Sequence, residues 1–88
     1  MEKINNIRKK INVIDKKVLQ LLNERAKETV EIGKLKNSSG KAVYVPSREA
    51  DILNSLYKTN NGPLSREQVN NIFKEIISSC RSLESKIR

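Results

Sequence analysis

The sequence predicts an all-α fold of three helices, one long, one short and one of medium length. Apolar residues recur at alternating spacings of three and four along most of the chain, which is the helical period rather than the strand period. Glycine and proline mark two breaks, in residues 37–46 and 60–63. The 88 residues suffice for one small domain, residues 1–88, with a thin core of Ile, Leu and Val.

The first predicted helix spans about residues 2–36 and carries a heptad a/d stripe. The stripe residues are Ile4, Ile7, Ile11, Ile14, Val18 and Leu21, then Ile32 and Leu35. At 1.5 Å per residue such a helix is about 50 Å long. So small a monomer cannot bury a stripe of that length, so we expect a partner helix from a second copy of the chain.

Local signals bound the other two helices. The segment NSSGKAVYVP, residues 37–46, is typical of a loop, and Pro46 opens a second helix over residues 46–59. NNGP at residues 60–63 stops that helix, and SREQ at residues 65–68 has the spacing of a capping box. It starts a third helix over about residues 65–86, whose stripe is Val69, Ile72, Phe73, Ile76, Ile77, Cys80, Leu83 and Ile87.

The composition limits the classes of function. A formal net charge of +8, from 18 Lys and Arg against 10 Asp and Glu, favours anionic partners. With no histidine and one cysteine, the chain excludes an internal disulfide, a Cys/His zinc site and histidine-dependent catalysis. No apolar run approaches the ~20 residues of a membrane span, and residues 1–10 lack the apolar region of a signal peptide. We therefore expect a cytoplasmic protein without a metal or a membrane partner.

Charged residues interrupt the apolar stripes where Ile or Leu is expected. In the first helix Arg25 takes an a position and Glu28 a d position, and Lys36 lies eleven residues beyond Arg25, within ~20° of the same face. Glu49 breaks the apolar face of the second helix, and Glu84 adjoins the stripe of the third. A single charged residue of this kind can set the register of helix pairing, or it can place its charged end in solvent. Several buried together are costly unless paired, so they predict a pocket for a small polar anion.

Arg8 is a further cation on the first helix. It lies 17 residues before Arg25, which is ~25 Å along the helix axis. One small ligand cannot touch both residues from the same straight helix. If Arg8 serves the pocket, it comes from a second chain in an antiparallel pairing, and the twofold creates two equal sites.

Four segments together resemble the all-helical (AroQ) class of chorismate mutases over nearly the whole chain: IRKKINVIDKKVLQLLNER, IGKLK, VPSREADIL and IFKEIISSCRSLE. The resemblance implies an intertwined, domain-swapped homodimer of three-helix subunits. It implies conversion of chorismate to prephenate, on the way to phenylalanine and tyrosine, by electrostatic preorganisation with no cofactor and no covalent intermediate. The tail SSCRSLESKIR is similar to the junction before a prephenate dehydratase domain in bifunctional P-proteins, so we expect either a domain of such a fusion or a free-standing enzyme.

The resemblance also assigns roles to residues. Arg25 and Arg8 of the partner subunit resemble the pair that clamps the two substrate carboxylates. Lys36 resembles the cation that contacts the ether oxygen and a carboxylate. Glu49 resembles the acceptor of the ring hydroxyl, and Arg48 the neighbouring arginine that supports the site electrostatically.

Three positions depart from the pattern of the best-known family member. Val45 stands where that member has an aspartate that helps to hold the ring hydroxyl, so only its backbone could act. Cys80 replaces a serine near a carboxylate. Glu84 replaces a glutamine that donates to the ether oxygen, and a glutamate can donate there only when protonated. The expected catalytic set is therefore Lys36, Glu84 and Arg25.

Two other functions stay open at this point. A nucleic-acid-binding protein would need cations gathered on one exposed face, often with aromatic residues. Here the basic residues are spread around the helices and the aromatics are few, so we do not expect nucleic acid as a partner. A non-catalytic helical dimer, or a regulatory chorismate-binding module, would keep the pocket without turnover, and the departures at Val45 and Glu84 are compatible with it.

Overall fold

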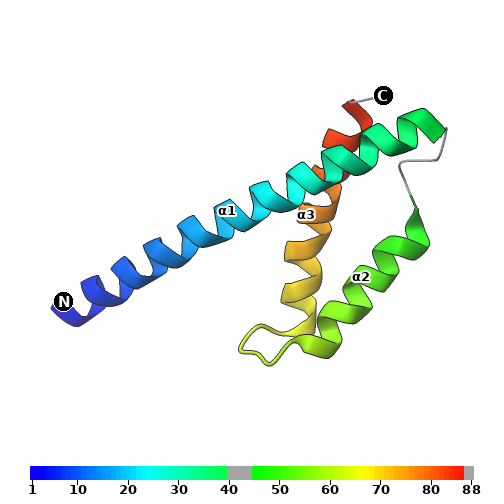
Figure 1. The fold of residues 1–88 in the computed structure, drawn as a ribbon. Coiled ribbons are helices and arrows are strands. Elements are labelled where there is room, and N and C mark those ends of the chain that lie inside the picture. Colours follow the sequence, from blue (N-terminus) through cyan, green and yellow to red (C-terminus); the bar gives the residue numbers. More distant parts are fainter. Residues whose placement is uncertain (40–44, 87–88) are drawn as a thin grey trace.

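The structure is a computed structural model that describes residues 1–39 and 45–86. These residues form three helices, α1 (Glu2–Ser39), α2 (Pro46–Thr59) and α3 (Arg66–Lys86), and contain no strand. The predicted all-α class with a long, a short and a medium helix is confirmed. Figure 1 shows α1 as one continuous rod, with α2 and α3 folded as a hairpin beside its C-terminal half.

The end of α1 differs from the expectation. The sequence pattern places Asn37, Ser38 and Ser39 in the loop, but they complete the last turn of the helix. None of them is Gly or Pro, so each costs at most about 0.7 kcal/mol relative to Ala, and a helix already formed adds residues without a new nucleus. The rest of the predicted loop, residues 40–44, and Ile87 of the third stripe lie outside the described residues.

The turn between α2 and α3 is built from side-chain-to-backbone hydrogen bonds. Asn60 accepts from the backbone N–H of Gly62 at 3.0 Å and donates to the carbonyl of Leu64 at 2.8 Å. Gly62 has a φ of +76°, a conformation that residues with a Cβ rarely adopt. Ser65 Oγ accepts from the N–H of Gln68 at 3.1 Å, and Gln68 Oε1 accepts from the N–H of Ser65 at 2.9 Å. The predicted capping box is therefore confirmed.

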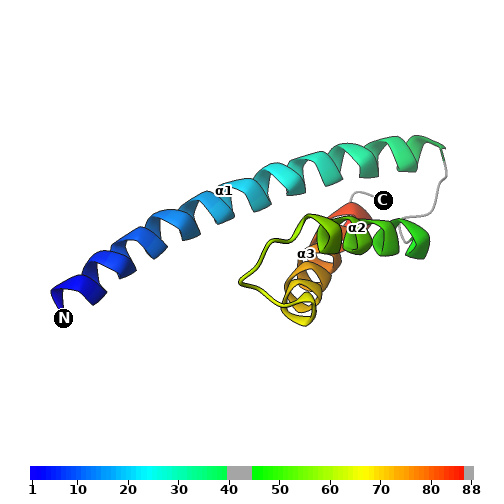
Figure 2. The ribbon, with the colours of Figure 1, turned by 90° about the horizontal axis from the view of Figure 1, so that it is seen from below.

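Helix α3 holds the three helices together. It packs against both α1 and α2, whereas the backbones of α1 and α2 do not come close to each other. Figure 2 shows α2 and α3 on the same side of α1. Far from α1, the Tyr57 hydroxyl donates to Asn70 Oδ1 at 2.9 Å, and the guanidinium of Arg66 lies 4.2 Å from the centre of the Tyr57 ring. These contacts tie the C-terminal end of α2 to the start of α3.

The N-terminal half of α1 extends beyond this small core. The radius of gyration is 16.3 Å, whereas a compact chain of this length has a value of about 12 Å. The stripe residues Ile4, Ile7, Ile11 and Ile14 are 46–56% exposed. Soluble monomers rarely expose so continuous an apolar surface, so a single chain leaves this stripe without a cover. In the part of the chain that the structure describes, no helix is apolar enough over a sufficient length to cross a membrane.

Candidate active site

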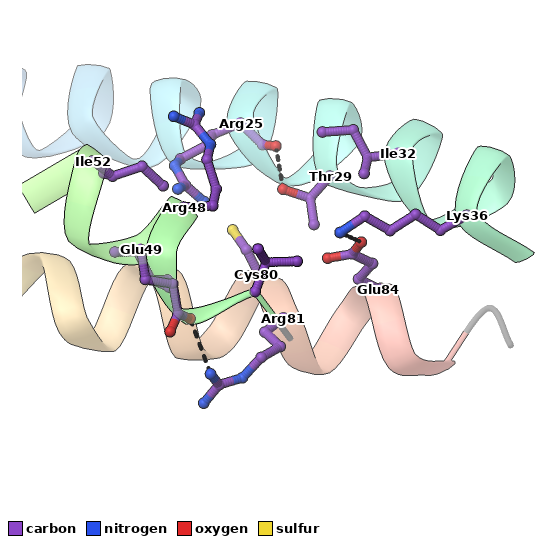
Figure 3. Close-up of a pocket in the computed structure, with 12 residues that line it drawn as sticks. Arg25, Thr29, Ile32, Lys36, Arg48, Glu49, Ile52, Cys80, Arg81 and Glu84 are labelled. Carbon is purple, nitrogen blue, oxygen red and sulfur yellow. Dashed lines mark hydrogen bonds and ion pairs between the residues drawn. The ribbon is translucent and has the colours of Figure 1, made fainter. Parts of the chain in front are cut away.

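A pocket of about 130 Å³ lies where the C-terminal halves of α1 and α3 meet the start of α2. Figure 3 shows side chains from all three helices converging on it. Every residue to which the resemblance assigns a role lines it, except Arg8, and Glu28, the other charged break in the stripe of α1, does not line it either. The residues brought together are Arg25, Lys36, Val45, Arg48, Glu49, Cys80 and Glu84.

The α1 side of the pocket follows from helical spacing. Arg25, Thr29, Ile32 and Lys36 succeed one another at intervals of four, three and four, so they share one face. The Thr29 hydroxyl donates to the carbonyl of Arg25 at 3.0 Å, so its proton is used within the helix. Ile32 supplies an apolar wall between the two cations. This face therefore presents two positive charges on a rigid element.

Lys36 and Glu84 meet across the pocket. Lys36 Nζ lies 2.9 Å from Glu84 Oε1, and the side chain of Glu84 is 9% exposed. This approach lacks hydrogen-bond geometry, and Glu84 Oε1 accepts no hydrogen bond from any residue that the structure describes. A buried carboxylate oxygen without a hydrogen bond is costly. The ion pair reduces that cost, and a polar ligand atom at this point would reduce it further.

Glu49 is held on the other side of the pocket. It lies in the first turn of α2, where the N–H groups of Arg48 and Glu49 donate to the carbonyl of Val45 at 3.0 and 3.3 Å. Its carboxylate accepts a hydrogen bond of 2.9 Å from Nη1 of Arg81 on α3. The predictions did not include Arg81. It follows Cys80 by one residue and lies ~100° off the apolar stripe, so the stripe does not mark it as a site residue.

The pocket has an excess of positive charge. Among the residues that the structure describes, four cations face two carboxylates, which gives a net charge of +2. The cations are Arg25, Lys36, Arg48 and Arg81, and the carboxylates are those of Glu49 and Glu84. Within residues 1–39 and 45–86, no group of three or more His, Cys, Asp or Glu is placed to hold a metal ion. The site as described therefore suits a small organic dianion.

Arg8 is the predicted residue that the single chain does not bring to the pocket. It is exposed, it does not line the pocket, and it stands 17 residues before Arg25, about 25 Å along α1. Figure 1 shows the N-terminal part of α1 well away from α2 and α3. Within one chain Arg8 therefore does not reach the pocket, and it can serve a site only in a second copy of the chain.

Comparisons with known proteins agree on one family. A family model described as chorismate mutase type II matches residues 7–85. The bifunctional chorismate mutase/prephenate dehydratase of Aquifex aeolicus is 40% identical over all of this chain, which covers 25% of that protein. A chorismate mutase of Methanocaldococcus jannaschii is 31% identical over 98% of this chain and 88% of its own length. The structure of a chorismate mutase (form II) from Thermus thermophilus matches with a TM-score of 0.93 at 35% identity, over 94% of both chains.

The relatives differ in size. The chain spans about a quarter of the length of the bifunctional relative from A. aeolicus, but most of the length of the one from M. jannaschii. The region matched by the family model includes every residue of the pocket, all of α2, and α1 and α3 except for their outer ends.

Proposed function

Because the chain belongs to the type II chorismate mutase family, we propose that it is an enzyme that converts chorismate to prephenate. The observation that carries this proposal is the pocket, where four cations and two carboxylates from three helices converge with a net charge of +2. Chorismate carries two carboxylates, so its charge of −2 is complementary to the net positive charge of the pocket. The net charge of +8 on the whole chain would also steer such a dianion inward.

The reaction is an intramolecular rearrangement. The ether C–O bond breaks while a new C–C bond forms, and no proton, electron or group leaves the substrate. The site therefore needs no nucleophile, and its work is to hold the compact chair-like geometry in which the two ends of the substrate meet. Arginine suits this task because its planar fork binds a carboxylate through two parallel hydrogen bonds.

In this proposal Arg25 of one chain and Arg8 of the partner subunit hold the two carboxylates. Cys80 lies beside one carboxylate of the substrate, and Arg48 adds positive potential at the N-terminal end of α2. Glu49 accepts the ring hydroxyl. Each of these residues except Arg8 lines the pocket of the single chain, which supports the assignment.

Lys36 and Glu84 carry the catalytic contribution. Negative charge develops on the ether oxygen as its bond to carbon breaks, and donors fixed at that point lower the barrier. The 2.9 Å separation of Lys36 Nζ and Glu84 Oε1 supports the placement of both groups at one point of the pocket. Lys36 donates to the ether oxygen as the ammonium, and Glu84 can donate there only when it is protonated. Val45 contributes its backbone only.

The same proposal includes an intertwined homodimer. The apolar stripe on the N-terminal half of α1 is exposed in a single chain, and Arg8 on the same half does not reach the pocket of its own chain. Antiparallel pairing of two α1 helices, with the N-terminal half of each against the body of the other, provides both. The relatives described as bifunctional join chorismate mutase to prephenate dehydratase, and we assign the mutase part to this segment.

The test is the loss of chorismate absorbance with purified protein. Wild type should deplete chorismate rapidly, and Arg25→Ala should slow it by about 100-fold or more, because it removes the central cation of the site. Lys27→Ala is the matched control, since Lys27 is an exposed cation two residues away and does not line the pocket. A folded, dimeric wild type without turnover would favour the non-catalytic chorismate-binding module instead.

A further inference from the structure

Arg81 has no role in the site as proposed so far, yet it makes a direct contact with one of its residues. We propose that Arg81 is a positioning residue, whose guanidinium holds the carboxylate of Glu49 in the orientation that receives the ring hydroxyl of the substrate. This inference rests on the proposed function and adds a residue to it.

The contact leaves Glu49 able to bind a second donor. Arg81 Nη1 donates to Glu49 Oε1 at 2.9 Å, a short, charge-assisted hydrogen bond. A carboxylate has two oxygens with about four acceptor positions. The other oxygen of Glu49, Oε2, accepts no hydrogen bond from the residues that the structure describes. Glu49 can therefore keep its bond to Arg81 and accept a hydroxyl at the same time.

The orientation of Glu49 matters because none of the other described α2 residues that line the pocket has a side-chain acceptor. Val45, one turn earlier, offers no side-chain acceptor, so on the α2 side the hydroxyl depends on Glu49 alone among the pocket residues. A glutamate side chain has several rotatable bonds, and fixing them costs entropy at the moment of binding. A partner that fixes them beforehand reduces this cost. Figure 3 shows the Glu49–Arg81 pair and the Lys36–Glu84 pair at separate places in the pocket.

A second place for the Glu49 carboxylate exists nearby. Glu49 and Arg81 also border a groove of about 320 Å³ between α2 and α3, together with Leu53 and Lys74. Lys74 lines this groove but not the pocket. Without Arg81, the carboxylate can turn toward Lys74 in the groove, which is also lined by Glu75. The ion pair with Arg81 keeps the carboxylate at the border of the pocket.

The structure supplies a control for a merely structural role. Tyr57 and Asn70 join the same two helices through a hydrogen bond of 2.9 Å, and Tyr57 lies eight residues beyond Glu49, ~12 Å along α2. Neither residue lines the pocket. Tyr57→Phe therefore loosens the attachment of α2 to α3 without touching the site. Lys74→Ala is the matching control for the loss of one positive charge near Glu49.

The test is a double-mutant cycle on kcat and KM for chorismate. Arg81→Gln should lower kcat/KM by about fivefold, which is the scale of a partly exposed ion pair, and should have almost no effect in a Glu49→Gln background. Arg81→Lys should restore most of the loss, because an ammonium can still hold Glu49. Tyr57→Phe and Lys74→Ala should leave kcat/KM unchanged in both backgrounds.

Three outcomes would overturn the proposal. The first is an equal loss from Arg81→Gln with and without the Glu49 carboxylate, because Arg81 would then act directly on the substrate. The second is no loss in either background. The third is a loss from Tyr57→Phe as large as that from Arg81→Gln, since the Arg81–Glu49 pair would then only attach α2 to α3. If Arg81→Gln does not fold, Arg81→Met, which keeps a side chain of similar length without its charge, takes its place in the cycle.

Calorimetric titration with prephenate repeats the cycle in Kd and does not depend on turnover. If wild type turns over chorismate but the effects of the Arg81 and Glu49 substitutions are additive, only the role of Arg81 is rejected and the proposed function stands. A wild type that neither depletes chorismate nor binds prephenate rejects the proposed function, and the role of Arg81 with it.

Discussion

Arg8 and Arg25 stand 17 residues apart on one straight helix, about 25 Å at 1.5 Å per residue. This separation predicts that two inactive chains restore activity when they are mixed. A chain with Arg8→Ala keeps an intact pocket but cannot complete that of its partner. A chain with Arg25→Ala has a defective pocket but can still donate Arg8. In the mixed dimer one site therefore has both arginines and the other has neither.

The expected recovery follows from counting sites. Random exchange of equal amounts of the two chains gives about half mixed dimers, each with one intact site of two. The mixture should thus reach about a quarter of the wild-type activity per chain. Each parent alone should stay near 1% or below, since the loss of a preorganised cation costs on the order of 100-fold in rate.

The assay is the loss of chorismate absorbance after subunit exchange, with exchange confirmed by native mass spectrometry of chains of different mass. Mixing Arg25→Ala with Lys36→Ala is the matched control. Both residues belong to the same chain's pocket, so each site of that mixed dimer lacks one of them and no activity should return. Confirmed mixed dimers of the Arg8 and Arg25 variants that are no more active than their parents would refute the shared site.

Three further predictions concern the interface, the catalytic carboxyl and the start of α3. The double variant Ile11→Asp/Ile14→Asp should be a monomer in sedimentation velocity and inactive in the chorismate assay, because it places four carboxylates in the proposed interface of two chains. A dimer of normal affinity would contradict that interface. Glu84→Gln should keep kcat at or above the wild-type value, because an amide always carries N–H donors; a large loss of kcat would count against the role of a donor at this position. Ser65→Ala should lower the free energy of unfolding by about 1 kcal/mol in urea, since the N–H of Gln68 loses its acceptor; an unchanged value would show that this cap does not stabilise the domain.

The helices could be predicted because their signals are local. The heptad spacing of α1 and the reciprocal bonds of Ser65 and Gln68 each depend on residues within one or two turns. The end of α1 was predicted less well. Residues 37–39 have weak preferences for helix or loop, and the preceding turns decide their conformation.

The site could be predicted in part because charge on an apolar face is conspicuous. Arg25 and Glu28 break the same stripe, but Arg25 lines the pocket whereas Glu28 is exposed and does not. The pattern alone could not separate them. Arg81 shows the opposite failure, because it lies off the stripe and meets Glu49 only through the packing of α3 against α2. That contact joins residues 32 positions apart, and no local pattern encodes it.

The exposed stripe and the missing cation point to the same register of two chains. Four of the exposed stripe residues, Ile11, Ile14, Val18 and Leu21, are centred at residue 16, and Ile4 and Ile7 continue the stripe toward the N-terminus. Completing the burial of such side chains stabilises by about 1 kcal/mol each, so a dimer that must offset an association cost of 4–15 kcal/mol needs nearly all of them covered in both chains. An antiparallel pair achieves this when its twofold axis passes near residue 16. Arg8 and Arg25 lie at equal distances from the midpoint of residues 16 and 17, so that axis places Arg8 of one chain level with Arg25 of the other. A slip of one heptad would move Arg8 by ~10 Å and would uncover part of the stripe. A register with its axis near residue 16 therefore covers the four central stripe residues and also completes the site, so the dimer and the activity should be lost together.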